Sequence, residues 1–159
     1  MSGVYKQRLD YFLLDADVFD STKVRVLTIR HGCAGPAVYF FLLCKCYGEY
    51  GYWAYWEDIY GVLYAEQLKL TLAQLHAVLD ACLNLDLFDR TLFERCCILT
   101  SRGIQRRYLF AVRERAKKAL RRGTVYTVDG SIWLLSQQET EEQLCAISPP
   151  HRSREPSAK

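Results

Sequence analysis

The sequence predicts a mainly α-helical fold with a small β-sheet (α+β), arranged as a winged helix-turn-helix. Helix-forming stretches dominate the chain up to residue 122, and a short turn separates two of them, 57–66 and 71–84. Two short apolar stretches around a polar loop follow directly, at 86–99. A short turn between two helices, followed by a two-stranded hairpin, is the pattern of a winged helix-turn-helix.

The first two helices are marked by the residues at their ends. The Asp-Ser-Thr run at 20–22 predicts the start of a first helix, which Gly32 ends. The Gly-Pro pair at 35–36 opens a second helix, because proline is tolerated in a first helical turn. This second helix is apolar on nearly every face over 37–47, so we expect it to be central and buried.

The middle of the chain holds the predicted helix pair. The aromatic stretch 52–56 is short and predicts a strand, and a helix follows over 57–66. After a turn, Thr71 begins a fourth helix that ends at Asn84. Thr71 and Gln74 have the spacing of a capping box, in which the threonine hydroxyl accepts the backbone N–H of the glutamine.

The predicted wing follows the fourth helix. Residues 86–89 and 96–99 are expected to be strands, joined by the polar loop 90–95 into a hairpin. A long last helix is predicted from about residue 100 to residue 122.

The chain divides into three parts at this level. We expect a winged-helix domain over 1–122, an extension over 123–147 and a disordered tail over 148–159. The extension is expected to hold a hairpin over 125–135. A short acidic helix is also expected within 134–147. This helix could dock to a partner or fold back onto the domain, and both interpretations remain open.

The composition argues against a membrane protein and against a secreted disulfide scaffold. The first residues are polar and basic without a signal peptide, and the longest apolar run, 36–44, is about half of what a bilayer crossing requires. We therefore expect a cytoplasmic protein with no membrane partner. The seven cysteines are odd in number and are not spaced like zinc ligands. They are expected to be buried reduced thiols, with no metal and no cofactor.

The last helix carries most of the positive charge. The net charge is +3, but residues 102–122 hold nine basic residues and one acid, so this stretch is +8 and the rest of the chain is −5. Cations one turn apart suit a phosphate backbone, and an exposed aromatic among them can stack on an unpaired base. The alternative is a solvated face whose charges pair with acids elsewhere. The predicted nucleic-acid contacts on this helix are Arg102, Arg106, Arg107, Phe110, Arg113, Lys117, Lys118 and Arg121.

Weaker candidates lie elsewhere. Arg90 and Arg95 in the predicted wing suit phosphates or a minor groove, and Lys69 suits a phosphate. The helix over 71–84 has the position of a recognition helix, yet its exposed side has no arginine or lysine, the residues that most often read guanine. This near-neutral side favours a protein partner, such as a second copy of the chain. The predicted partner interface is Gln74, His76, Ala77, Asp80 and Asn84.

One stretch imitates an enzyme motif. Residues 12–18 are similar to the strand and Asp-x-Asp opening of haloacid-dehalogenase-type phosphatases, where Asp15 would be the nucleophile and Asp17 the general acid. Such enzymes also need a distant acidic pair and a parallel sheet, which this length and order of elements do not supply. We therefore expect no catalytic residues and no enzyme.

Two groups of motifs point to a family. The first comprises Asp10-Tyr11-Phe12, Asp15-Ala16-Asp17, Lys23-Val24 and the segment from His31-Gly32 through Gly35 to Tyr39. The second comprises Ala77 to Leu83, Asp86 to Phe88 and Leu99 to Tyr108. Together, over residues 9–122, they resemble the N-terminal domain of DnaD-like replisome-organiser proteins of phages and mobile elements. The resemblance implies a winged-helix fold and a role in replication initiation, with DNA and replication proteins as partners.

The sequence therefore predicts a nucleic-acid-binding module in phage or mobile-element DNA replication initiation, with mostly phosphate contacts. The alternative is a protein-interaction or oligomerisation module that uses a winged-helix scaffold.

Overall fold

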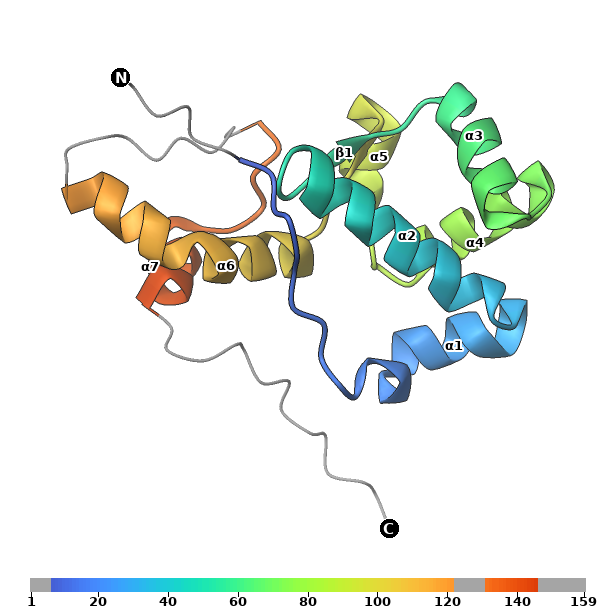
Figure 1. Cartoon of the computed structure of the whole chain (residues 1–159), viewed down its shortest axis with the longest axis horizontal. Helices are drawn as coiled ribbons and strands as arrows, with labels where there is room; N and C mark the ends of the chain where they lie inside the picture. The colour runs from blue at the N-terminus through green and yellow to red at the C-terminus, as the bar shows by residue number, and fades with distance from the viewer. Residues whose placement is uncertain (1–6, 122–130, 146–159) are drawn as a thin grey trace, which may run out of the picture.

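The computed structural model in Figure 1 describes residues 7–121 and 131–145, without the side chains of 117–121. Its helices and strands form a mainly α-helical fold with a small antiparallel sheet, which confirms the predicted class at that level. The elements are a 3₁₀ turn Val18–Asp20, α1 Thr22–His31, α2 Ala34–Glu49, β1 Ala54–Tyr55, α3 Asp58–Leu68, α4 Leu72–Asn84, α5 Arg90–Cys96, β2 Ile98–Leu99, α6 Arg102–Arg121 and α7 Gln137–Cys145.

Helix α2 is the centre of the fold, as its apolar sequence predicts. Its residues Leu42, Leu43 and Cys46 are fully buried, and α1, α4 and β1 all pack against it. The crossing with α1 is close, because a Cβ at Gly35 would lie 2.6 Å from the carbonyl oxygen of Leu27. Glycine is therefore needed at this position.

The helix pair α3 and α4 is also confirmed. Lys69 ends α3 in the left-handed conformation, with φ of 58°, which turns the chain into α4 within a few residues. The predicted capping box is present, because Gln74 N donates to Thr71 Oγ1 at 3.1 Å and Thr71 N donates to Gln74 Oε1 at 2.9 Å.

The predicted hairpin over 86–99 is wrong. Residues 90–96 form a helix, α5, whose start is capped by Asp89 Oδ1 accepting from Leu92 N at 2.8 Å. The strand β2 pairs with β1, with Ala54 opposite Leu99. The Asp89 cap and the inward-facing Leu92 favour a helix between α4 and β2. Residues 86–89 therefore do not form the predicted partner strand, and β2 pairs instead with β1, which lies far from it in the sequence.

The described part of the extension, residues 131–145, folds back onto the domain, which is one of the two outcomes considered for it. Helix α7 packs against α6 (Figure 1). Ile132 and Leu135, which precede α7, are buried. The described part of the predicted 125–135 hairpin, residues 131–135, contains no strand, and its remainder lies outside the described residues. The 148–159 tail also lies outside them.

The prediction that the cysteines are buried is correct for two of the seven. Cys46 and Cys82 are buried, whereas the other five are exposed, and all seven are free thiols. Burial raises the pKa of the Cys82 thiol to about 12, which makes it inert at neutral pH. Across the described residues, no group of three or more side chains is placed to hold a metal ion. None of the described helices has the length and apolarity needed to cross a bilayer.

Candidate nucleic-acid interface

One side of α6 belongs to the core. Ile104, Tyr108, Val112 and Ala116 follow each other at four-residue intervals, and each is at most 1% exposed. This stripe fixes the rotation of α6 against α2, because residues four apart lie on one face of a helix. The arginines between the stripe positions are thereby placed on the remaining sides.

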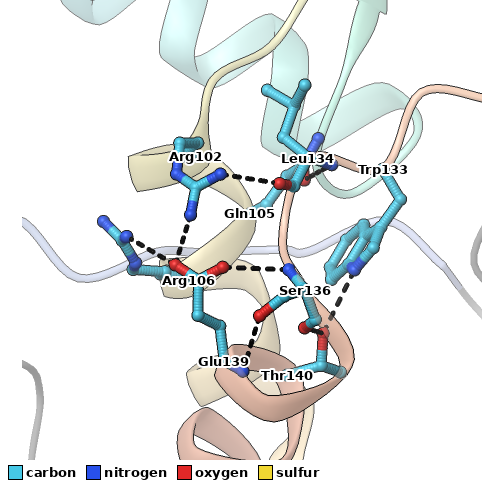
Figure 2. Close-up of polar contacts among 8 residues, drawn as sticks. All are labelled: Arg102, Gln105, Arg106, Trp133, Leu134, Ser136, Glu139 and Thr140. Atoms are coloured by element: carbon cyan, nitrogen blue, oxygen red, sulfur yellow. Dashed lines mark hydrogen bonds and ion pairs between the residues drawn. The ribbon is translucent and has the colours of Figure 1, made fainter.

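Arg102 and Arg106 converge on a single carboxylate (Figure 2). Glu139 of α7 accepts at Oε1 from Nη2 of Arg102 and, at 3.2 Å, from Nη2 of Arg106. Its other oxygen, Oε2, accepts from Ser136 N at 2.9 Å, while Glu139 N donates to Ser136 Oγ, which makes a capping box at the start of α7. The side chains of Arg102, Arg106 and Glu139 remain 49%, 41% and 29% exposed.

The surroundings of Glu139 stabilise its charged form. The hydrogen bond from the backbone of Ser136, followed by that from Arg102, lowers its pKa to about 2. The carboxylate is therefore ionised at every physiological pH. Two guanidiniums against one carboxylate leave this cluster with a surplus positive charge.

A buried amide anchors the segment that leads into α7. Gln105 is fully buried, and its Nε2 donates to the carbonyl oxygen of Ile132 at 2.9 Å, while its Oε1 accepts from Leu134 N at 2.7 Å. Arg102 adds a hydrogen bond from Nη1 to the carbonyl oxygen of Leu134 at 2.8 Å. Sequence reasoning missed both Gln105 and Glu139. The Ser-x-x-Glu pattern at 136–139 is the signal that could have indicated the latter.

Arg107 has partners within the fold, and its side chain is 25% exposed, so it is less accessible to a phosphate than Arg102 or Arg106. Its guanidinium donates to the hydroxyl oxygens of Tyr47 and Tyr39, and it lies 3.9 Å from a carboxylate oxygen of Asp15. Burial by itself lowers the pKa of Arg107, but the interactions with Tyr47 and Tyr39 outweigh it and raise the pKa. Arg107 therefore ties α6 to α2.

Phe110 is not exposed, contrary to the sequence interpretation. Only 6% of it is accessible, and the Arg113 guanidinium lies 3.8 Å from its ring centroid. Arg113 also donates from Nη1 to the carbonyl oxygen of Phe110 at 2.6 Å. The error has a physical cause, because a helical wheel drawn for α6 alone shows neither the folding of Arg113 over the ring nor the contacts that other parts of the chain make with this helix. Phe110 is thus not available to stack on a base.

The other predicted contacts are scattered. Arg90 is held by Glu94 at 3.2 Å and by Asn84 at 2.6 Å, and it lies with Arg95 on α5, so neither is on a wing. Lys69 is exposed in the turn between α3 and α4. Lys117, Lys118 and Arg121 lie on α6, with side chains outside the described residues.

The predicted partner face on α4 is exposed only in part. Ala77 and Asp80 face solvent, whereas His76 is half-buried against Trp56, with ring centroids 6.2 Å apart. Gln74 is engaged in the capping box and Asn84 by Arg90. A neighbouring face was missed by sequence reasoning. It consists of the exposed apolar residues Ile59, Val62 and Leu63 of α3, with Leu72 of α4.

Comparisons with known proteins place this arrangement in a phage-related context. Residues 11–104 match the family described as Lin1244/Lin1753-like, N-terminal. Over 118 residues the chain is 35% identical to the uncharacterized phage-related protein Lin1244/Lin1753 of Listeria innocua serovar 6a. The alignment covers 74% of this chain and 38% of the length of that relative. No solved structure matches the chain.

Proposed function

The chain belongs to the Lin1244/Lin1753-like N-terminal family, and we propose that it is a non-enzymatic nucleic-acid-binding module of a phage-related protein. We place its action in the initiation of phage or mobile-element DNA replication, on the strength of its resemblance to DnaD-like replisome organisers. DNA would be its principal partner, with replication proteins in contact with the same assembly.

We further infer that the fold is a variant of the winged helix, similar to the DnaD-like domains. The order of helix, strand, helix, turn and helix over α2 to α4 suits that fold, and so does the pairing of β1 with a strand that follows α4. In this interpretation α5 takes the place of the wing.

The observation that carries the nucleic-acid proposal is the surplus of positive charge along α6. Arg102 and Arg106 share the carboxylate of Glu139 and are still close to half exposed. The helix continues toward its C-terminal end with Lys117, Lys118 and Arg121. Phosphates of a nucleic acid would neutralise this surplus and release counterions, which gives a binding free energy that weakens with salt.

The same surface offers little for reading sequence. The exposed side of α4 holds Gln74, Ala77, Asp80 and Asn84 and has no arginine or lysine. Base edges are usually read by such side chains in the major groove, whereas phosphate contacts position a protein without specifying sequence. We therefore expect weak sequence preference.

Fluorescence anisotropy with labelled single- and double-stranded DNA, at several salt concentrations, tests the proposal. The double variant Lys117→Glu/Arg121→Glu should bind at least about tenfold more weakly than the wild type and show a shallower salt dependence. The double variant Arg25→Glu/Arg30→Glu changes the net charge by the same amount, at exposed positions of α1. Its loss of DNA affinity should be much smaller. Failure of the wild type to bind either DNA at low salt, or equal losses in both variants, would contradict the proposal.

A second candidate function is protein interaction, and the apolar face of α3 favours it. Ile59, Val62 and Leu63 are each about half exposed, which is unusual for three apolar residues on one helix face. Light scattering across a range of protein concentrations tests for a second copy as partner. If this face is an interface between copies, Leu63→Asp should shift the wild-type oligomer to a monomer, and a monomeric wild type would count against self-association.

A further inference from the structure

We propose that Glu139 occupies a phosphate site of this protein, so that α7 competes with nucleic acid for Arg102 and Arg106. The inference rests on the proposed function and adds a regulation of the same surface. In the structure, the carboxylate lies where the two guanidiniums converge, and a phosphate oxygen can take the position of its Oε1 once α7 moves away (Figure 2).

The geometry of the two arginines is that of an oxyanion site. Arg102 and Arg106 are one helical turn apart, and both present an Nη2 to the same oxygen. Guanidinium groups bind phosphate and carboxylate oxygens through the same charge-assisted hydrogen bonds. A site formed for one of these anions therefore accepts the other.

A phosphate has access to this site. The two guanidiniums and the carboxylate are all partly exposed, and exposed ion pairs contribute little to stability. The second carboxylate oxygen is bound within its own segment, by Ser136 N, so among the hydrogen bonds of the described residues it is Oε1 that joins α7 to the two arginines. At the two arginines themselves, exchange of one anion for the other therefore replaces only these contacts, while the packing of α7 against α6 is what the bound phosphates have to outweigh.

The segment before α7 provides a fixed base for the movement. Gln105 holds Ile132 and Leu134 by backbone hydrogen bonds that do not involve Glu139. Helix α7 can thus leave α6 while residues 132–134 stay in place. Helix α7 also carries the exposed acids Glu141 and Glu142, so its displacement moves further negative charge away and reduces repulsion of a polyanion.

The test compares two charge-matched variants of the full chain. Glu139→Gln removes the competing charge and keeps the α7 capping box, because glutamine serves at that position as well as glutamate. Glu141→Gln changes the net charge equally on the same helix, where the carboxylate accepts only from Gln137 among the hydrogen bonds of the described residues. We expect Glu139→Gln to bind DNA about fivefold more tightly than Glu141→Gln in anisotropy titrations at low salt.

A second readout follows α7 itself. The indole N–H of Trp133 donates to Thr140 Oγ1 at 3.2 Å, so its NMR resonance reports on the docked helix, and a Trp133→Phe variant assigns it. Adding DNA to the wild type should shift this resonance. In Glu139→Gln it should already lie part of the way to the DNA-bound position.

The outcomes separate the two proposals. If all three proteins bind DNA, and the variants have equal affinities or the Trp133 resonance does not move, the competition is refuted and nucleic-acid binding stands. If none of the three binds DNA at low salt, the nucleic-acid function is refuted, and the competition falls with it. Tighter binding by Glu139→Gln together with a shifted resonance supports both.

Discussion

Arg106 and Arg107 are neighbours in sequence, yet their guanidiniums have different roles. Arg106 faces α7 and remains partly exposed, whereas Arg107 points to Tyr47 and Tyr39 of α2. A rotation of 100° between consecutive helical residues is enough to separate a surface cation from a structural one. The positive charge of α6 could be predicted from sequence, but the assignment of each arginine could not.

Arg107→Ala should destabilise the protein by about 2 kcal/mol, because it leaves the tyrosine hydroxyls of α2 without their charged donor. The free energy of unfolding in urea measures this loss. Arg95→Ala serves as the control, since Arg95 is exposed on α5 and should change stability little. A similar free energy of unfolding for Arg107→Ala and Arg95→Ala would show that Arg107 does not join α6 to α2.

At the scale of single elements, α5 shows how a local signal can be misinterpreted. The stretch 90–95 is polar enough to suggest a loop, and the flanking apolar residues suggest strands. Asp89, however, is an N-cap residue immediately before it, and Leu92 and Phe93 supply an inward-facing pair. The cap was visible in the sequence, and the hairpin interpretation overlooked it.

Asp89→Ala should cost about 1 kcal/mol of stability, because a helix as short as α5 depends on the bond from Leu92 N to its cap. Hydrogen exchange of the amides over 92–97 should accelerate in this variant. Asp80→Ala removes the same charge from an exposed position of α4 and should leave these amides unchanged. Unaltered exchange after Asp89→Ala would indicate that tertiary packing alone maintains α5.

The docking of α7 should depend on pH in acid. The pKa of Glu139 is about 2 in the folded protein and near 4.5 without its partners, so ionisation stabilises docking above pH 4.5. This contribution should be lost progressively as the pH falls from 4.5 toward 2. The Trp133 indole resonance measures the change.

Glu139→Gln provides the control for this titration, because it lacks the titrating group. Its Trp133 resonance should show no transition attributable to residue 139 in the same range. Loss of docking in the wild type already above pH 5 would contradict the lowered pKa of Glu139.

Across the whole molecule, Gln105 connects two parts of the chain that sequence analysis treated separately. It is a fully buried polar residue on α6 that bonds to Thr100, Ile132 and Leu134. A buried amide with satisfied bonds fixes the position of the segments it joins. Residues 131–145 thereby form part of the surface that α6 presents.

Gln105→Ala should destabilise the protein by roughly 2 to 4 kcal/mol, because it leaves a cavity and unsatisfied backbone groups at 132–134. It should also accelerate cleavage at the glutamates of α7 by a protease that cuts after glutamate. Gln67→Ala, on the exposed side of α3, should change neither property. An unchanged cleavage rate in Gln105→Ala would mean that α7 docks without the buried amide.

The sequence by itself determined helices α1 to α4 and α6, the α3–α4 turn, the capping box of α4 and the central place of α2. Caps, glycine stops and apolar periodicity act within a few residues, so each stretch encodes them locally. The tertiary structure alone decided the pairing of β1 with β2, the burial of Phe110 and the union of Arg102 and Arg106 with Glu139. Each of these depends on contacts between residues far apart along the chain, which become neighbours only when the core brings their elements together.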